Sequence, residues 1–162
     1  MDTRTHRCGE VGISDVGDDV ALMGWVRTHR DHGRLVFLDL WDREGMIQVV
    51  ADPKVSPEAY ETAQGLRSEY VVVVRGEVRA RPVGTENPAL RTGAVEVAAC
   101  EIEVLNEARV PPFPLGEGTR VDERVRAQYR YLDLRQGYLQ RNLRLRHKTI
   151  RAMRAVLDRE AF

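Results

Sequence analysis

The sequence is poor in cysteine, lacks long apolar runs and has no net charge, and each shortage excludes a class of protein. Its two cysteines, Cys8 and Cys100, lie far apart in no CxxC pattern. This argues against a zinc site or a disulfide scaffold and is typical of a reduced cytoplasm. No apolar run approaches the roughly 20 residues of a membrane helix, and the first ten residues lack the apolar segment of a secretory signal. We therefore expect a cytoplasmic protein without a membrane segment.

Motifs that mark catalytic or metal sites are also missing. The chain contains no GxxxxGK, no GxSxG and no HExxH. Its histidines, His6, His29, His32 and His147, do not stand at metal-ligand spacing. We therefore expect no catalytic centre, no metal and no cofactor in this chain.

The zero net charge hides an uneven distribution. Residues 1–123 carry a charge of about −8, and residues 124–162 carry about +8. A basic block of this length either contacts phosphate groups or forms a solvated helix face beside an acidic neighbour. The charge pattern alone favours neither interpretation.

The first two thirds of the chain alternate between strand patterns and turn residues. Strands are predicted at 20–30, 34–41, 46–51, 70–80 and 94–105. Ser56, Pro57 and Glu58 predict a helix start, with a capping serine and a proline at the first helical position. Three strands, a helix and two strands is the order of the OB-fold, a five-stranded Greek-key barrel that often binds oligonucleotides. The sequence therefore predicts a mostly β protein of this kind, with another small β-barrel as the alternative.

Beyond the barrel the pattern changes to a linker and a long helix. We divide the chain into an OB-fold domain at 1–106, a linker or hinge at 107–134 and a C-terminal α-helix at 135–162, because prolines and glycines crowd the start of the middle segment. One apolar stripe at helical spacing follows this helix: Leu139, Leu143, Ile150, Met153 and Leu157. A lone helix cannot bury such a stripe, so we expect it to dock onto a further domain and to fray without one.

The second predicted strand offers an aromatic surface. Its alternation places Leu38 on one face and Phe37, Asp39 and Trp41 on the other. An unpaired carboxylate is costly to bury, so the face with Asp39 is expected to lie outside the barrel. An exposed Phe37 ring there could stack on an unpaired base, which contributes about 1–3 kcal/mol.

Polar residues on neighbouring segments strengthen this interpretation. The Gln48 amide can donate to and accept from a base edge, and Arg27, Arg30 and Arg34 flank the first hairpin, where they could hold phosphates. Taken singly, Phe37 is better explained by a second apolar layer under a loop, and Gln48 by a solvated position. The combination on neighbouring strands of an OB-fold favours nucleic-acid binding.

Whole motifs of this sequence resemble bacterial aspartyl-tRNA synthetases along essentially its whole length. The matching stretches are HRCGEV (6–11), LMGWV (22–26), RDHG (30–33), LVFLDLWDREGMIQVV (35–50), LRSEY (66–70), RGEVRARP (75–82), YRYLDLR (129–135) and NLRLRHKTIRAMRAVLDREAF (142–162). The YRYLDLR stretch is shared with lysyl synthetases and indicates class IIb. The RDHG and DREG surroundings favour the aspartyl family.

The resemblance implies that the barrel binds the anticodon loop of tRNA, whose bases turn outward to be recognised. Phe37 matches the residue that stacks on the middle base, and Gln48 matches the residue that hydrogen-bonds to that base. Arg30 and Asp31 match loop residues at the first base. The matches near the last base and its backbone are Arg79, Arg81 and Asn87.

Two departures from the family pattern concern backbone contacts. Trp41 stands where relatives have the arginine of DLRDREG, and Thr28 and His29 replace basic residues before RDHG. Both changes remove expected phosphate contacts and predict a weaker affinity than the family norm. Trp41 offers a stacking surface in exchange.

The resemblance also bears on which tRNA is recognised. Some bacterial relatives charge both tRNA(Asp) and tRNA(Asn), whose anticodons differ at the last base. Those relatives tend to have histidine after the RD pair and glycine in the loop after the fourth strand. His32 and Gly84 occupy these positions and predict that the last base is not discriminated.

For the full-length protein, the resemblance implies that residues 135–162 are the first helix of a class II catalytic domain, truncated here, whose motifs for ATP, magnesium and aspartate lie beyond Phe162. That enzyme, expected as a homodimer, would attach aspartate to tRNA through an aspartyl-adenylate, whereas this chain alone should bind tRNA without catalysis. One alternative is a free-standing OB-fold RNA-binding module. Another is a protein-binding OB domain, which a buried Phe37 would favour.

Overall fold

The computed structural model describes residues 4–116 and 121–161. The chain divides into two compact units, Met1–Val110 and Pro111–Phe162. The first unit contains the 3-10 helix η1 (Ile13–Asp15), the strands β1 (Asp19–Asp31), β2 (Val36–Trp41) and β3 (Met46–Ala51), the helix α1 (Pro57–Gly65), and the strands β4 (Val71–Ala80) and β5 (Val95–Asn106). The second contains the helices α2 (Glu123–Gln128), α3 (Arg130–Asp133) and α4 (Gly137–Arg159).

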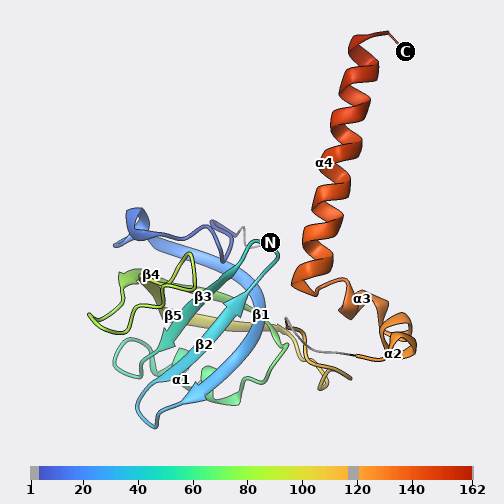
Figure 1. Cartoon of the computed structure of the whole chain (residues 1–162). Coiled ribbons are helices and arrows are strands. Elements are labelled where there is room, and N and C mark those ends of the chain that lie inside the picture. The colour runs from blue at the N-terminus through green and yellow to red at the C-terminus, as the bar shows by residue number, and fades with distance from the viewer. Residues whose placement is uncertain (1–3, 117–120, 162) are drawn as a thin grey trace. The chain divides into compact units, whose positions relative to one another are not determined.

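The five strands close into a barrel in the order β1-β2-β3-β5-β4, in which β1 also pairs with β4 (Figure 1). Every neighbouring pair is antiparallel except β3 and β5, which are parallel. Closure gives each strand two partners, which removes the exposed edges that an open sheet would carry. With α1 between β3 and β4 in the chain, this arrangement confirms the predicted OB-fold.

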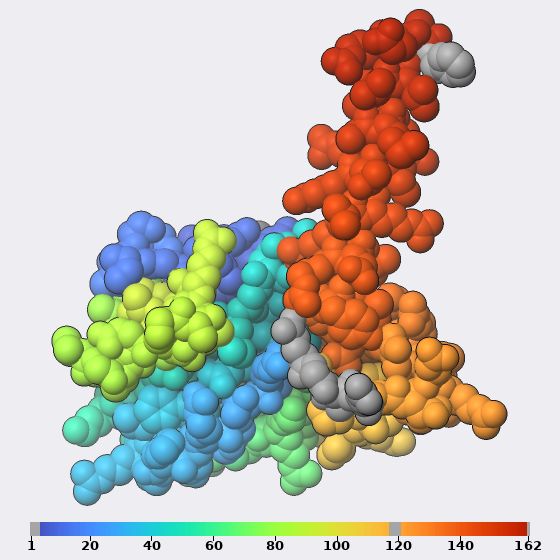
Figure 2. Space-filling model, in the orientation of Figure 1, coloured from blue at the N-terminus to red at the C-terminus, as the bar shows by residue number. Residues whose placement is uncertain are grey.

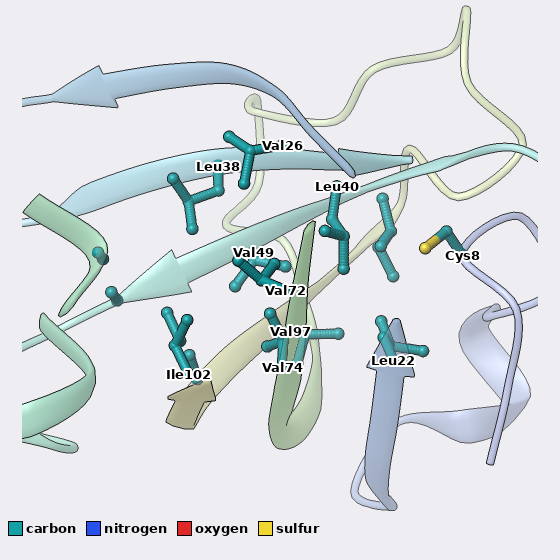
Figure 3. Close-up of a cluster of buried hydrophobic side chains, with 14 of the residues drawn as sticks. Cys8, Leu22, Val26, Leu38, Leu40, Val49, Val72, Val74, Val97 and Ile102 are labelled. Carbon is teal, nitrogen blue, oxygen red and sulfur yellow. The ribbon is translucent and has the colours of Figure 1, made fainter. Parts of the chain in front are cut away.

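The core of the barrel consists of branched aliphatic side chains from alternate strand positions. Figure 3 shows Leu38 and Leu40 of β2 together with Val49 of β3 and Val74 of β4, all fully buried. Each such side chain contributes about 1.5–3 kcal/mol by leaving water. Val36 is buried on the same face, so the predicted inward face of β2 is confirmed.

A bulge in β1 decides which way the end of this strand faces. The register with β2 runs from Val26 opposite Leu40 to Thr28 opposite Asp39, which leaves Arg27 as an extra residue. Before the bulge, even-numbered residues such as Val26 point inward. After it the phase is reversed, as expected for a one-residue insertion. Arg30, opposite Phe37, therefore lies on the outer face.

The helix α1 begins as predicted. The Ser56 hydroxyl accepts a hydrogen bond from the Ala59 amide, and Pro57 occupies the first helical position, where its missing N–H is not needed. Ala59 and Ala63 form the buried face of the helix. These small side chains let α1 pack closely on the barrel.

The N-terminal segment is fastened to the β2–β3 turn. The buried Asp42 carboxylate accepts hydrogen bonds from the amides of Cys8 at 3.0 Å and Glu44 at 2.7 Å. Gly9 is needed there, because a Cβ atom would lie 2.3 Å from the Glu44 carbonyl oxygen. Burial raises the pKa of the Cys8 thiol, and the Asp42 charge raises it further. The segment therefore acts as part of the core.

The second unit begins with two short helices in the segment expected as a linker. Asp133 of α3 is almost fully buried and accepts hydrogen bonds from Arg126 at 2.9 Å and Arg130 at 2.6 Å. The bond to Asp133 raises the pKa of the Arg126 guanidinium. The YRYLDLR motif thus supplies a buried carboxylate that ties α2 to α3.

The long helix α4 confirms the predicted C-terminal helix and shows the predicted apolar stripe. Leu143, Ile150, Met153 and Leu157 are between about 37 and 61% exposed. Among the helices of the described residues, none is long and apolar enough to cross a membrane.

Candidate nucleic-acid interface

A row of polar residues crosses four strands of the barrel. The register pairs Asp39 of β2 with Gln48 of β3, Gln48 with Glu96 of β5, and Glu96 with Arg79 of β4. Residues directly opposite each other in adjacent strands point to the same face of a sheet. None of these four side chains is buried, so the row lies on the outer face of the barrel.

Arg30 joins this row from β1. Its guanidinium donates from Nη1 to Asp39 Oδ2 at 3.1 Å and from Nη2 to Asp39 Oδ1 at 2.9 Å. Nη2 also donates to Gln48 Oε1 at 3.3 Å. A two-point pair with a carboxylate fixes the plane of a guanidinium, which a single contact does not. Arg30 remains 41% exposed at its side chain, so it can reach a ligand.

The Gln48 amide is oriented from both sides. While its oxygen accepts from Arg30, its Nε2 donates to Glu96 Oε2 at 2.8 Å. The amide therefore presents a fixed donor and a fixed acceptor on the outer face. Glu96 was not singled out from the sequence. Only the register of the parallel β3–β5 pair places it beside Gln48.

Phe37 lies on the outer face, as its strand alternation predicts. It is partly exposed and stands in register opposite Arg30 and Val50. The His32 ring meets it edge-on, with centroids 5.4 Å apart and an interplanar angle of 88°. The His32 ring thus supports the Phe37 ring beside the polar row. A partly exposed Phe37 removes the condition that would have favoured a protein-binding OB domain.

The β1–β2 hairpin carries the candidates Asp31 and His32 at its exposed tip. Asp31 Oδ1 accepts from the Gly33 amide at 2.7 Å, and the His32 amide donates to the Leu35 carbonyl at 3.0 Å. Gly33 has a φ of 75°, a left-handed conformation that glycine adopts without strain. These local bonds shape the turn.

The candidates for the last base lie at the end of β4 and in the loop that follows it. Arg79 is exposed and pairs with Glu77 at 2.7 Å, whereas Arg81 is buried and donates from Nε to the Val95 carbonyl at 3.0 Å. Arg81 therefore anchors the base of the loop. Pro82 to Ala89 of this loop are exposed, and the segment is yellow-green in Figure 2.

Asn87 and Gly84 differ in what fixes them within that loop. The side-chain Oδ1 of Asn87 accepts a hydrogen bond from the backbone N–H of Ala89, and the backbone N–H of Asn87 donates to the Gly93 carbonyl at 2.9 Å. Gly84 has a φ of 86°, but a Cβ atom there would meet open space. Glycine is favoured at this position by its backbone conformation and not by crowding.

Trp41 continues the outer face of β2 beyond Asp39. The Arg27 guanidinium lies 5.2 Å from the centroid of the Trp41 ring, within cation–π range, and the Trp25 ring is 6.0 Å from it. Over the residues that the structure describes, no group of three or more His, Cys, Asp or Glu side chains could hold a metal ion. The side chains of this face supply hydrogen bonds, aromatic rings and charge.

Comparisons with known proteins agree with this description. The family model named for the tRNA anticodon and described as an OB-fold nucleic acid binding domain matches residues 20–105. Aspartate–tRNA(Asp/Asn) ligase from Moorella thermoacetica is 54% identical over 159 residues, which are 98% of this chain and 26% of that protein. The chain thus spans about a quarter of the length of this curated relative.

Solved structures show the same architecture. Asparaginyl-tRNA synthetase from Pyrococcus horikoshii, in complex with asparaginyl-adenylate, aligns with a TM-score of 0.80 and 28% identity, covering 99% of this chain and 35% of that one. Aspartyl-tRNA synthetase from Entamoeba histolytica, at 20% identity and a TM-score of 0.86 over 99% of this chain and 38% of its own, supports the fold alone. The chain belongs to the tRNA anticodon family of OB-fold nucleic acid binding domains, in a form similar to that of bacterial aspartate–tRNA ligases.

Proposed function

We propose that this chain binds the anticodon loop of tRNA(Asp) as one part of an aspartate–tRNA ligase. The observation that carries the proposal is the network of Arg30, Asp39, Gln48 and Glu96 beside the partly exposed Phe37 ring, all on the outer face of one OB barrel. A ring beside fixed hydrogen-bonding groups is what recognition of a splayed-out base requires.

The middle base of the anticodon would stack on Phe37 and pair with Gln48. An amide that offers one donor and one acceptor matches the edge of uracil, where an N–H lies next to a carbonyl oxygen. In the free protein, these two groups of Gln48 are bonded to Arg30 and Glu96. Each group keeps one further hydrogen-bonding position, a second N–H on Nε2 and a second lone pair on Oε1, so uracil can bind while the two existing bonds remain.

The two outer bases would be contacted from the loops. Arg30 and Asp31 are the contacts proposed for the first base, because both lie at the end of β1 next to Phe37. Arg79 and Asn87 are the contacts proposed for the last base and its backbone. We assign Arg81 a supporting role in this recognition, because its Nε already holds the Val95 carbonyl.

Recognition of tRNA(Asn) as well as tRNA(Asp) is part of the proposal. The similar ligase of Moorella thermoacetica is named for both tRNAs, and His32 and Gly84 are the residues to which we assign the tolerance at the last base. In the free protein, the His32 ring packs against Phe37.

The remaining activities belong to the full-length protein. We assign ATP, magnesium and the aspartyl-adenylate to a catalytic domain in the three quarters of its relatives' length that this chain does not cover, and we propose a homodimer. This work would take place in the cytoplasm, which agrees with two free cysteines. The proposal for this chain alone is binding without catalysis.

The test is binding of the chain to an anticodon stem-loop with GUC and to one with a scrambled loop, over a salt series from about 50 to 200 mM. We expect the preference for GUC to survive added salt while both affinities fall, because base contacts release fewer counterions than phosphate contacts. Equal binding that salt abolishes would leave only the basic residues of the second unit as RNA contacts. That result would remove the anticodon assignment for Phe37 and Gln48.

A further inference from the structure

The hairpin that carries Arg30 and Asp31 is hydrogen-bonded to α1. The Tyr60 hydroxyl donates to the Gly33 carbonyl oxygen at 3.2 Å, and it accepts from Gln64 Nε2 at 3.2 Å. The Tyr60 ring packs against the hydrophobic core, so the hydroxyl is carried on a fixed support. A side chain of α1 thereby fixes the backbone of the turn.

A second bond connects α1 to β1 ahead of the turn. His29 Nε2 lies 3.0 Å from the Ala63 carbonyl oxygen. Because a carbonyl oxygen can only accept, Nε2 carries the proton and donates. His29 stands opposite the buried Leu38, so its ring faces the side where α1 packs and not the outer face of Arg30. The base and the tip of the hairpin are each tied to one turn of α1.

The tip of this hairpin lies beyond the paired parts of β1 and β2. Its strand pairing ends at Asp31 opposite Val36, and the bonds of the turn itself join Asp31 to Gly33 and His32 to Leu35. Such local bonds shape the turn but do not orient it. A loop that must be ordered on binding costs affinity, and one that is already held in place does not.

We propose that Tyr60 is a positioning residue for recognition of the first anticodon base, assisted by His29. It acts through Gly33, and it holds the hairpin tip next to Asp31 where that base is met, while Arg30 is ordered by its pair with Asp39. This inference rests on the proposed function, since it names what sets the specificity of one part of that site. Phe37 and Gln48 lie on regular strands and do not depend on Tyr60 for their positions.

The variant Tyr60→Phe tests the inference because it removes one hydroxyl and keeps the packed ring. Tyr70→Phe is the matched control: Tyr70 also packs against the core, and its hydroxyl bonds to Glu107 at 3.3 Å, away from the hairpin. We expect discrimination between G and A at the first base to fall about two- to tenfold in Tyr60→Phe, as for one lost hydrogen bond. Discrimination between U and C at the middle base should not change.

His29→Ala should lower discrimination at the first base in the same direction. Equal first-base discrimination in Tyr60→Phe and Tyr70→Phe would overturn the inference. Exchange of the His32 and Gly33 amides, measured without RNA, should accelerate only in Tyr60→Phe, and unchanged exchange there would overturn it independently. If the unaltered chain shows no preference for GUC, the proposed function fails instead, and the amide exchange still decides whether Tyr60 holds the hairpin.

Discussion

Arg30 and Asp39 form a two-point ion pair between β1 and β2, with N–O distances of 3.1 and 2.9 Å. The pair exists because the bulge at Arg27 turns Arg30 to the outer face, where Asp39 and Phe37 already lie. A guanidinium held in one plane can present its remaining donors to a base without first losing side-chain freedom. We therefore regard Asp39 as the residue that orders Arg30 before tRNA arrives.

Asp39→Asn should weaken this order while it keeps the size of the side chain. We expect the free energy of unfolding to fall by less than about 1 kcal/mol, because Arg30 is partly exposed and such pairs are screened by solvent. The preference for a GUC loop over a scrambled loop should fall by about three- to tenfold. Titration of both loops by fluorescence anisotropy measures this ratio.

Glu101→Gln is the matched control for this experiment. It neutralises one partner of another ion pair on the barrel, that of Glu101 with Arg75 at 3.3 Å. The GUC preference should be unchanged in this variant. A similar loss in both variants would mean that the overall charge of the barrel matters and that the Arg30–Asp39 geometry does not.

Phe37→Leu should lower affinity without lowering stability much. The ring is only partly buried, but stacking of a base on it contributes about 1–3 kcal/mol. The expected loss of affinity for the GUC loop is therefore about fivefold to a hundredfold. Phe37→Trp keeps an aromatic face and should retain most of the affinity. Equal affinities of the leucine and tryptophan variants would show that Phe37 contributes no stacking.

The face of Phe37 could be predicted from the sequence because it depends on neighbours in the same strand. Asp39, two residues further along the strand, identifies the outer face by its carboxylate. Period-two alternation places Phe37 on the same face. The order of strands and helix predicted the OB-fold for a similar reason, since each element has its own local signal.

The hydrogen-bond network of the site could not be predicted, because it depends on the register between strands that are distant in the sequence. Glu96 lies 48 positions from Gln48 along the chain, and only the parallel β3–β5 pair brings them together. The bulge at Arg27 has no mark in the local sequence, yet it decides the direction of Arg30. The burial of Arg81 is likewise a tertiary effect, since its bond is to Val95 of another strand.

The two cysteines should differ in reactivity. Cys100 is exposed, whereas Cys8 is buried and its thiol pKa is raised, so little thiolate forms at Cys8 in the folded protein. Iodoacetamide at neutral pH should modify Cys100 quickly and Cys8 only after unfolding, as mass spectrometry of the digested protein can show. Rapid labelling of Cys8 in the folded protein would mean that the N-terminal segment detaches from the β2–β3 turn.

The raised pKa of Cys8 also predicts how stability changes with pH. The folded state holds the thiol proton more tightly than the unfolded state, whose thiol has an ordinary pKa near about 8.5. The stabilisation is complete below that pH and is lost as the pH rises above it. Between about pH 8 and pH 9.5, the free energy of unfolding of the unaltered protein should fall by about 1 kcal/mol more than that of Cys8→Ala. Parallel curves for the two proteins would contradict the raised pKa.

The tolerance proposed at the last anticodon base can be measured by comparing GUC and GUU loops. With His32 at the hairpin tip and Gly84 in a loop open to solvent, we expect the two dissociation constants to agree within about threefold, or less than about 1 kcal/mol. A preference for GUC of about a hundredfold would show instead that the last base is read and that the chain is specific for tRNA(Asp).

Gly84→Ala separates two explanations of a small difference. Because the φ of 86° strains any side chain while the space around it is open, this variant changes the loop conformation without filling a contact. If Gly84→Ala changes the ratio of the GUC and GUU dissociation constants, the tolerance depends on the conformation of the protein's β4–β5 loop. An unchanged ratio would assign the tolerance to His32 and the hairpin.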